Sequence, residues 1–352
     1  MDSSNGSATN ETTQTLTAFQ IVAVTIFTLT SLAAVIAYSL VLGVLFYYFR
    51  EFRSNFYFII VSLSVADVAY LALILFYVVP CTILRRHIWS PGDYGAGLLE
   101  CWAYISQCVH LVFIALNRLA YASVSTRLDT TRKLDAIFNN GGMIAFWIVF
   151  IWGLSAAIAM PLKLIGCDLI YHYEALDFMR DCSGRVNTPV ATHRATVADA
   201  VISGLLPVLV TALHIITWFT VYAKGRQSAF TSATSTHSGA TTSQNEQLVR
   251  RRKREQRTLI QFTLISVVLL LFYASFWIIP FALPGSAGAA VVTLFGISSS
   301  GVNPFTYLAF NKLMKAKARY LIFQKLLRKG VNVVSSLQPP PSAGGRMAGR
   351  QH

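Results

Sequence analysis

The sequence has few charged residues for its length. Only 12% of its 352 residues are Asp, Glu, Lys or Arg, whereas 54% are hydrophobic. This is about half the charged share of an ordinary globular protein. A soluble core cannot bury so much apolar surface, so most of the chain is expected to lie in lipid. Five cysteines allow at most two bridges, which excludes a disulfide-dense scaffold.

Acidic residues are especially scarce: there are 15, against 29 basic residues. The placement of the basic residues explains the imbalance. If the N-terminus lies outside the membrane, the inner loops and tail hold 22 basic residues and the outer side holds six. The positive-inside rule expects such an asymmetry. The net charge of +14 therefore indicates membrane topology and not nucleic-acid binding.

Seven apolar stretches are each long enough to cross a bilayer, which takes about 20 residues. We therefore predict an all-α integral membrane protein, a bundle of seven transmembrane helices. An amphipathic helix is expected after the last span, at residues 310–327, on the inner leaflet. The predicted spans cover residues 19–48, 56–84, 95–121, 142–164, 198–222, 259–283 and 287–310.

The polar segments divide the rest of the chain. Residues 1–18 are predicted to be an extracellular N-terminus, glycosylated at Asn5 and Asn10, each of which begins an Asn-X-Ser/Thr sequon. Residues 19–325 form the membrane domain, with a disordered inner loop at 228–247. Residues 326–352 are a cytoplasmic tail, disordered from about 335.

Asp67 is the outstanding polar residue within a span. A charged side chain near the bilayer centre costs about 2.5–3.5 kcal/mol on insertion scales unless it has partners. Helical spacing brings candidate partners to matching faces of the third and seventh spans: Gln107, Ser299, Ser300 and Asn303. Two interpretations remain open. The cluster holds a small cation such as sodium, or a neutral Asp67 bonds Asn303 as packing.

The last span ends with Asn303-Pro304-Phe305-Thr306-Tyr307. Pro304 frees a backbone carbonyl, which Ser300 or a water molecule can satisfy. With this motif the chain resembles the rhodopsin-like G-protein-coupled receptors, and among them the nematode serpentine chemoreceptors of the Srx-like group. Further motifs that carry the resemblance are Leu63-Ser64-Val65-Ala66-Asp67, Phe76-Tyr77-Val78-Val79-Pro80, Asn117-Arg118-Leu119, Trp152 with Pro161, Pro207, Pro280 and Phe310-Asn311-Lys312.

The resemblance implies a receptor that couples an extracellular small-molecule ligand to a heterotrimeric G protein, at the plasma membrane. By position, Arg118 would contact the G protein and Tyr307 would swing inward on activation. Asp67 and Asn303 would belong to a sodium-linked polar network. The alternative for Arg118 is a cation that anchors its helix at the interface. An amine or peptide receptor of the same superfamily is the alternative function.

Several positions depart from the superfamily's pattern. Asn117 replaces the acid expected before Arg118, so the carboxylate that would restrain the arginine is missing. Two residues, not one, separate Trp277 from Pro280, which turns the tryptophan toward a different face. The remaining departures are Leu119 for an aromatic residue, Ser39 for asparagine, Ile215 for tyrosine and Asp93 for cysteine.

A ligand pocket is expected near the outer ends of the helices. Glu100 stands where amine receptors of the superfamily carry an aspartate, and Asp199 lies at the outer end of the fifth span. Two carboxylates facing one pocket favour a basic ligand, with Tyr104 and Trp277 lining the same pocket. The alternative is that Glu100 pairs with a nearby cation, Lys163 or Arg86, or with water.

Cys167 and Cys182 both fall in the second outer loop, where the compartment permits a disulfide. We predict that they pair, with Cys81 competing for either. Cys101 and Cys108 lie within the third span and are expected to act as small buried hydrophobic residues.

Other function classes lack their sequence features. A transporter or channel would show internal repeats or paired broken helices. An opsin would need a lysine in the last span, and residues 287–310 contain none. An enzyme would need a catalytic pair or metal-ligand spacing in the spans, and His110 and His214 lie singly on different helices.

Overall fold

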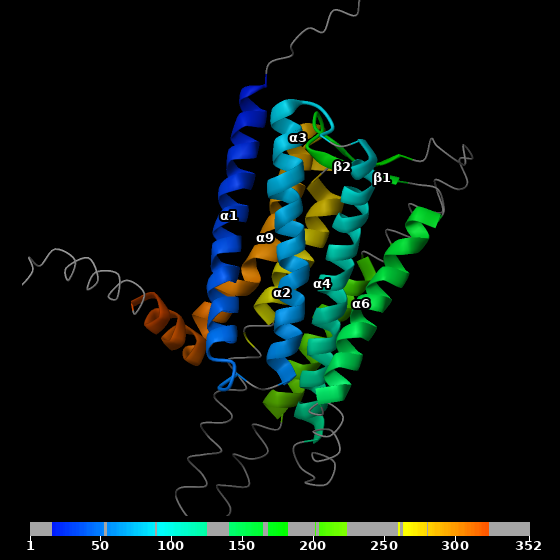
Figure 1. Cartoon of the computed structure of the whole chain (residues 1–352). Coiled ribbons are helices and arrows are strands. Elements are labelled where there is room, and N and C mark those ends of the chain that lie inside the picture. The colour runs from blue at the N-terminus through cyan, green and yellow to red at the C-terminus, as the bar shows by residue number, and fades with distance from the viewer. Residues whose placement is uncertain are drawn as a thin grey trace, which may run out of the picture.

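A computed structural model shows a bundle of helices packed side by side (Figure 1). The structure describes residues 16–52, 55–88, 90–124, 141–164, 168–181, 201, 204–223, 260, 263–279 and 281–323. Each of the seven predicted spans coincides with helix. These helices are α1 (Ala18–Tyr47), α2 (Asn55–Leu73) continued by η1 (Ile74–Val78) and α3 (Val79–Leu84), α4 (Ser90–Val124), α6 (Gly141–Leu164), Gly204–Ala223, Thr263–Ile279 and α9 (Ser286–Phe310).

Lipid explains why the chain adopts helices here, because every backbone group must find its partner within the segment. Within the described residues, five helices are long and apolar enough to cross a membrane, and Thr263–Ile279 is a shorter apolar helix. Outward faces carry large exposed apolar side chains, such as Leu29, Ile36 and Val149. In water such surface would be costly, whereas in lipid it matches its solvent.

The first helix begins with a capping box. The Thr17 hydroxyl accepts a hydrogen bond from the Gln20 amide at 3.2 Å, and the Gln20 side chain accepts one from the Thr17 amide at 3.2 Å. Two otherwise unpaired amides at the helix start are thereby satisfied.

The second span changes its winding before Pro80. The π-helical turn η1 lies between α2 and α3, and Pro80 stands in the first turn of α3. Proline cannot continue the hydrogen-bond ladder, and a π-turn inserts one extra residue into a helix. The face that α3 presents to its neighbours is therefore rotated relative to α2.

Two strands join the helices at one end of the bundle. Strands β1 (Asp168–His172) and β2 (Asp177–Asp181) form an antiparallel hairpin in which Asp168 pairs with Asp181 and His172 with Asp177. The hairpin lies at the same end as α3 and the start of α1 (Figure 1). We call this end the hairpin end. The helical bundle agrees with prediction, and the hairpin is an addition.

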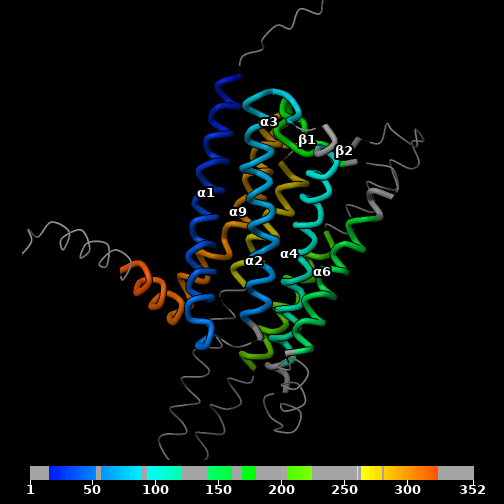
Figure 2. The backbone as a smooth tube through the Cα atoms, in the orientation of Figure 1, coloured from blue at the N-terminus to red at the C-terminus, as the bar shows by residue number. Residues whose placement is uncertain are grey.

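Buried side chains form one core near each end. The core at the hairpin end joins α1, α2, η1, α3 and α9 to the hairpin, and it includes Tyr171 and Leu176. The core at the opposite end includes Tyr307 and Met314. A short helix at residues 312–323 follows α9 and turns away from the bundle axis (Figure 2). It coincides with the predicted amphipathic helix.

Candidate functional site

A buried polar cluster lies between the two cores. Asp67 in α2 is completely buried, and its Oδ2 accepts hydrogen bonds from the Tyr38 hydroxyl and from Asn303 Nδ2, the latter at 2.7 Å. Gln107 in α4 donates to the Ser300 hydroxyl at 2.8 Å. The Tyr38 hydroxyl also lies 2.9 Å from the Ser300 carbonyl. We call these five residues the Asp67 cluster; they tie α1, α2, α4 and α9 together.

The cluster has oxygen atoms left over. Asp67 Oδ1 and Asn303 Oδ1 are buried and have no hydrogen-bond partner within the described part of the chain. The same is true of the hydroxyl of Tyr307, which is not a member of the cluster and lies one turn beyond Asn303 on α9. Buried polar atoms are nearly always bonded, so such oxygens call for a water molecule or a cation. Carboxylate, amide and hydroxyl oxygens suit a hard cation such as sodium. The donor set therefore fits a sodium ion, one of the two interpretations that the sequence left open; the hydrogen bond from Asn303 to Asp67 belongs to the other.

Two serines of the first and seventh spans lie outside this arrangement. The Ser299 hydroxyl is buried but donates to Gly296 of its own helix at 2.9 Å, and no contact joins it to Asp67. Ser39 is exposed and donates to the Val35 carbonyl at 2.9 Å. Its neighbour Tyr38 makes the contact from α1 to Asp67.

At the end opposite the hairpin, α4 carries Arg118 six residues before it finishes at Val124. Arg118 is half-buried and Asn117, its neighbour, is buried. Tyr307 is buried in the core at this end, and Pro304 lies buried inside α9. The residues that the resemblance assigns to coupling thus gather at one end of the bundle.

The predicted pocket residues at the hairpin end do not all come together. Glu100 and Tyr104 are half-buried on α4, one turn apart, and Tyr104 packs edge-on against Phe272 with ring centres 5.7 Å apart. Trp277, by contrast, is 38% exposed, and among the described residues its ring contacts are with Tyr273 and Phe276 on its own helix. Phe272, and not Trp277, is the residue of this helix whose ring contacts Tyr104, and the place of Trp277 in the pocket stays a prediction.

Asp93 occupies the position where the superfamily has a cysteine. Its Oδ1 accepts a hydrogen bond from the Tyr77 hydroxyl, and its Oδ2 lies 3.0 Å from His87 Nδ1. Asp93 is buried. At this position Asp93 therefore joins α4 to η1 and to the turn after α3 through polar contacts.

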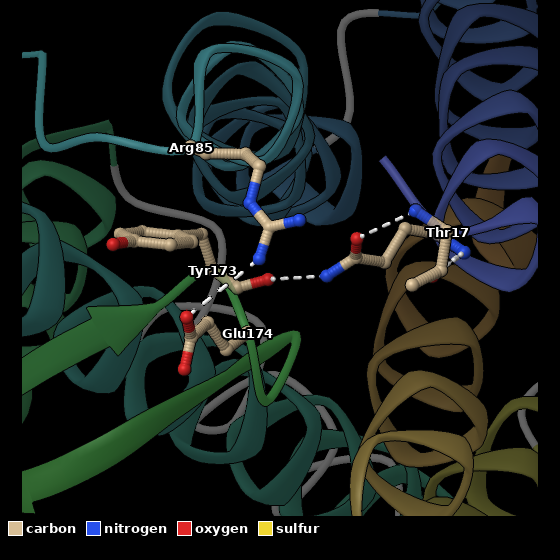
Figure 3. A network of polar contacts seen from close by, with 5 residues as sticks. Thr17, Arg85, Tyr173 and Glu174 are labelled. Carbon is tan, nitrogen blue, oxygen red and sulfur yellow. Dashed lines mark hydrogen bonds and ion pairs between the residues drawn. The ribbon is translucent and has the colours of Figure 1, made fainter. Parts of the chain in front are cut away.

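Polar contacts attach the hairpin to the surrounding helices (Figure 3). Gln20 of α1 donates to the Tyr173 carbonyl at 3.4 Å, Arg85 lies 3.6 Å from Glu174, and Thr293 of α9 donates to the Leu176 carbonyl at 3.1 Å. A fourth contact joins Thr82 and Tyr171, whose hydroxyls are 2.7 Å apart. Contacts to α1, α3 and α9 hold the hairpin over this end of the bundle.

Asp177 is a half-buried acidic residue at the start of β2. Surrounding protein raises the pKa of its carboxyl to about 7, because burial disfavours the charged form. The Phe178 amide donates to Asp177 Oδ1 at 2.8 Å and offsets part of this rise.

Some predictions fall on residues outside the described part of the chain. These are Asn5 and Asn10, the Cys167–Cys182 pair, Asp199, Pro280, the loop 228–247 and the tail from 324 onward. Cys81, the predicted competitor for a disulfide, is completely buried and has no disulfide partner. Cys108 is also buried, as expected for a small hydrophobic residue within the third span.

Sequence reasoning missed Tyr38 and Asp177. Tyrosines are amphipathic and occur at many positions in membrane helices, so nothing in the pattern distinguishes Tyr38. The second strand of the hairpin carries a signal, because Leu176 and Phe178 alternate with the polar Asp177 and the exposed Met179, whereas Ile170 stands between Leu169 and Tyr171 in the first strand.

Comparison with known proteins agrees with this architecture. The model of the serpentine-type seven-transmembrane G-protein-coupled chemoreceptors of the Srx family matches residues 29–311. The chain belongs to this family. The receptor also resembles squid rhodopsin in a crystal structure, with a TM-score of 0.70 over 92% of this chain and 93% of the rhodopsin chain. At 12% identity this likeness shows the shared fold. No curated protein matches the sequence.

The receptor is therefore a multi-pass membrane protein and a G-protein-coupled receptor of a chemoreceptor family. Ligands and G proteins are the general partners of such receptors. The family and the fold are those of G-protein-coupled receptors, which are not enzymes.

Proposed function

We propose that the receptor lies in the plasma membrane, binds a small extracellular molecule at the hairpin end and activates a heterotrimeric G protein at the opposite end. The Asp67 cluster carries this proposal. It joins four helices midway between the two ends, through hydrogen bonds whose donor–acceptor distances are 2.7–2.9 Å. A polar side chain within the membrane is costly unless it is paired with another polar group. A helix of the cluster therefore cannot move without its partners, so the cluster couples the positions of these helices.

Signal transfer requires a ligand that binds one arrangement of the helices better than another. At the hairpin end, Thr293 of α9 contacts the hairpin, and Asn303, three turns further along the same helix, contacts Asp67. At the far end of α9 lies Tyr307. A ligand that shifts α9 beneath the hairpin changes the Asp67 cluster and the surroundings of Tyr307 and Arg118 together.

A sodium ion is proposed to bind within the Asp67 cluster. Asp67 would supply the charge, and Asn303 and Ser300 would supply neutral oxygens. Such an ion would offset the cost of a buried carboxylate and stabilise the helix arrangement that binds it. Removing sodium should then favour the arrangement that lacks it.

The proposed orientation places the N-terminus outside. It is supported by the 22 basic residues on the inner side against six on the outer side, and by the two sequons that precede α1. It also places the short basic helix at 312–323 against the anionic inner leaflet, where exposed lysines are attracted to lipid headgroups.

Nucleotide exchange tests the function directly. The receptor is reconstituted in lipid nanodiscs with purified α-subunits of each major G-protein class and βγ, and guanine-nucleotide exchange is measured. Exchange faster than in empty nanodiscs with at least one class is expected without added ligand, because Asn117 supplies no restraining carboxylate next to Arg118. If no class responds, basally or to an odorant and amine panel, coupling to G proteins is contradicted.

A further inference from the structure

A cavity of about 60 Å³ lies at the end of the bundle opposite the hairpin, between the last turn of α1 and the start of α2 (Figure 1). This is room for about four to six groups the size of a water molecule or a methylene. Its walls are Leu45, Val61 and five aromatic side chains, those of Phe46, Phe49, Phe52, Tyr57 and Phe58. Water does not fill so apolar a cavity, because it needs polar partners, so the expected occupant is itself apolar.

The rings around the cavity are held by one another across the two helices. In the turn at residues 48–52, the Phe52 amide donates to the Tyr48 carbonyl at 3.3 Å, which folds the chain back from α1 toward α2. Phe52 is 2% exposed and packs edge-on against Tyr57, with ring centres 4.8 Å apart. Phe49 packs in the same way against Phe58, with ring centres 5.7 Å apart. The cavity is therefore preformed, and a ligand does not have to rebuild its walls.

The cavity opens to the lipid-facing side of the bundle. Two of its walls, Phe46 and Phe49, are 65% and 46% exposed. Aromatic rings exposed near the end of a membrane helix lie against lipid. An apolar void there forfeits dispersion contacts of the atoms that line it, and a hydrocarbon chain that enters restores them. Lipid tails are the hydrocarbon chains that surround the helices, so an acyl chain is the occupant that fits.

The chain beside the cavity carries an excess of positive charge. Residues 40–61 and 305–323 contain six basic residues and a single acid, Glu51. Lys317 pairs with Glu51. Arg50 is exposed, stands between two of the aromatic cavity residues in the sequence, and forms no ion pair with an acidic side chain of the described residues. The charge next to the cavity therefore suits an anionic group.

We propose that the cavity binds one acyl chain of an anionic phospholipid, whose phosphate group pairs with Arg50. With the proposed orientation, this lipid belongs to the inner leaflet. A guanidinium can donate two parallel hydrogen bonds to one phosphate group, and a tail in the neighbouring cavity holds that phosphate in place. A zwitterionic phospholipid has the same phosphate and tails, but its positive amine meets an excess of basic residues here. The site therefore discriminates between the two headgroups.

A bound lipid is expected to stabilise the start of the helix at residues 312–323. Tyr57, a wall of the cavity, accepts a hydrogen bond from Asn311 Nδ2 at 3.2 Å, and Asn311 Oδ1 accepts one from the Met314 amide at 3.2 Å. Met314 is completely buried in the core at this end. A tail that holds the Tyr57 ring in place thus also holds the helix that follows α9. The lipid should therefore raise the unfolding temperature of the receptor.

Lipid binding is counted by native mass spectrometry of the full receptor in detergent, without any G protein. The probes are dioleoyl phosphatidylglycerol and dioleoyl phosphatidylcholine, which share their tails and differ in headgroup charge. We expect phosphatidylglycerol to half-saturate its first site at a concentration at least about fivefold lower, the effect of one arginine on an anionic lipid. Equal binding of the two lipids overturns the proposal. Displacement of phosphatidylglycerol by an equal concentration of cholesterol also overturns it, because the cavity would then be a sterol site.

Variants assign the binding to the cavity and to Arg50. Val61→Phe fills the cavity from α2 and should raise the half-saturating concentration of phosphatidylglycerol at least fivefold. Val149→Phe makes the same change at an exposed position of α6 and should have no effect. Arg50→Gln should reduce the preference for phosphatidylglycerol to less than twofold, whereas Arg86→Gln, at an exposed arginine of the hairpin end, should preserve it. Parental binding by folded Val61→Phe overturns the site.

A photoreactive lipid locates the tail independently of these variants. Phosphatidylglycerol with a diazirine in one tail is activated in the presence of the receptor, and the labelled peptides are identified after digestion. We expect the heaviest labelling within residues 45–61, reduced by excess phosphatidylglycerol more than by excess phosphatidylcholine. Equally heavy labelling of α6 overturns the site. Unfolding temperatures without added lipid show which variants fold, and if Val61→Phe does not, the labelling still decides. No readout contains a G protein, so failure of the lipid site and failure of the proposed coupling are separate results.

Discussion

The hydroxyl of Tyr38 in α1 donates to Asp67 in α2 and also lies 2.9 Å from the Ser300 carbonyl in α9. That carbonyl is the one left without its helical partner by Pro304, because proline has no amide hydrogen four residues further on. The Tyr38 hydroxyl thus lies within hydrogen-bond distance of both the buried Asp67 carboxyl and the carbonyl that Pro304 leaves without a helical partner. The expected partner of this carbonyl was the Ser300 side chain or water; the structure shows a residue of another helix.

Removing this hydroxyl should destabilise the receptor. Tyr38→Phe leaves the Ser300 carbonyl and one Asp67 oxygen short of a donor, at an expected cost of about 1–3 kcal/mol. A lower unfolding temperature in nanodiscs is the measure. Tyr47→Phe, an exposed tyrosine of the same helix, is the control and should have no effect. Equal unfolding temperatures for Tyr38→Phe and the parent would show that water replaces the hydroxyl at no cost.

Loss of Arg118 should abolish coupling but not folding. Arg118→Ala is expected to reach the cell surface at the parental level and to lose G-protein activation. Arg50→Ala, an exposed arginine in the loop after α1, is the charge-matched control. Parental nucleotide exchange with Arg118→Ala would show that the arginine only anchors α4 at the interface.

The orientation predicts glycosylation of the N-terminus. Glycosidase treatment of the expressed receptor should increase its mobility in a gel, and Asn5→Gln combined with Asn10→Gln should abolish the change. An antibody to a C-terminal tag should bind only after permeabilisation. Staining of intact cells through that tag would reverse the proposed topology.

The hairpin register predicts a disulfide. Asp168 pairs with Asp181, so the same register continued by one pair sets Cys167 opposite Cys182. Both cysteines lie outside the described residues. Opposed residues of antiparallel strands have Cα atoms about 4.5–5.5 Å apart, within the range of a disulfide. Mass spectrometry of a non-reduced digest should find the linked peptides, and Cys81 joined to either cysteine would contradict the pairing.

Stability should depend on pH through Asp177. Its pKa is about 7 in the folded receptor and about 4 in an unfolded chain, so the folded state binds more protons between these values. The stability that Asp177 contributes is therefore lost as pH rises from 4 to 7. The difference between the unfolding temperature of Asp177→Asn and that of the parent should therefore increase as the pH rises from 4 to 7. A constant difference would show that the Asp177 carboxyl titrates normally.

Much of this molecule is determined by the sequence itself. Each span is a continuous apolar run, and in lipid such a run has to become a helix because only its own backbone can satisfy its hydrogen bonds. The seven helices and the short helix after α9 follow from this local requirement. The contact between Asp67 and Asn303 was also predictable, since a buried acid needs a partner and the seventh span offers an amide.

Which residues face one another was decided only by the tertiary structure. The rotation of each helix about its axis depends on its neighbours, so Phe272 rather than Trp277 contacts Tyr104, and Tyr38 rather than Ser39 reaches Asp67. The hairpin depends on contacts to three distant helices, because two strands alone are marginally stable. One of those contacts, from Thr293 to the Leu176 carbonyl, holds the residue next to Asp177 against α9. Periodicity within one segment carries no information about partners so far away in the chain.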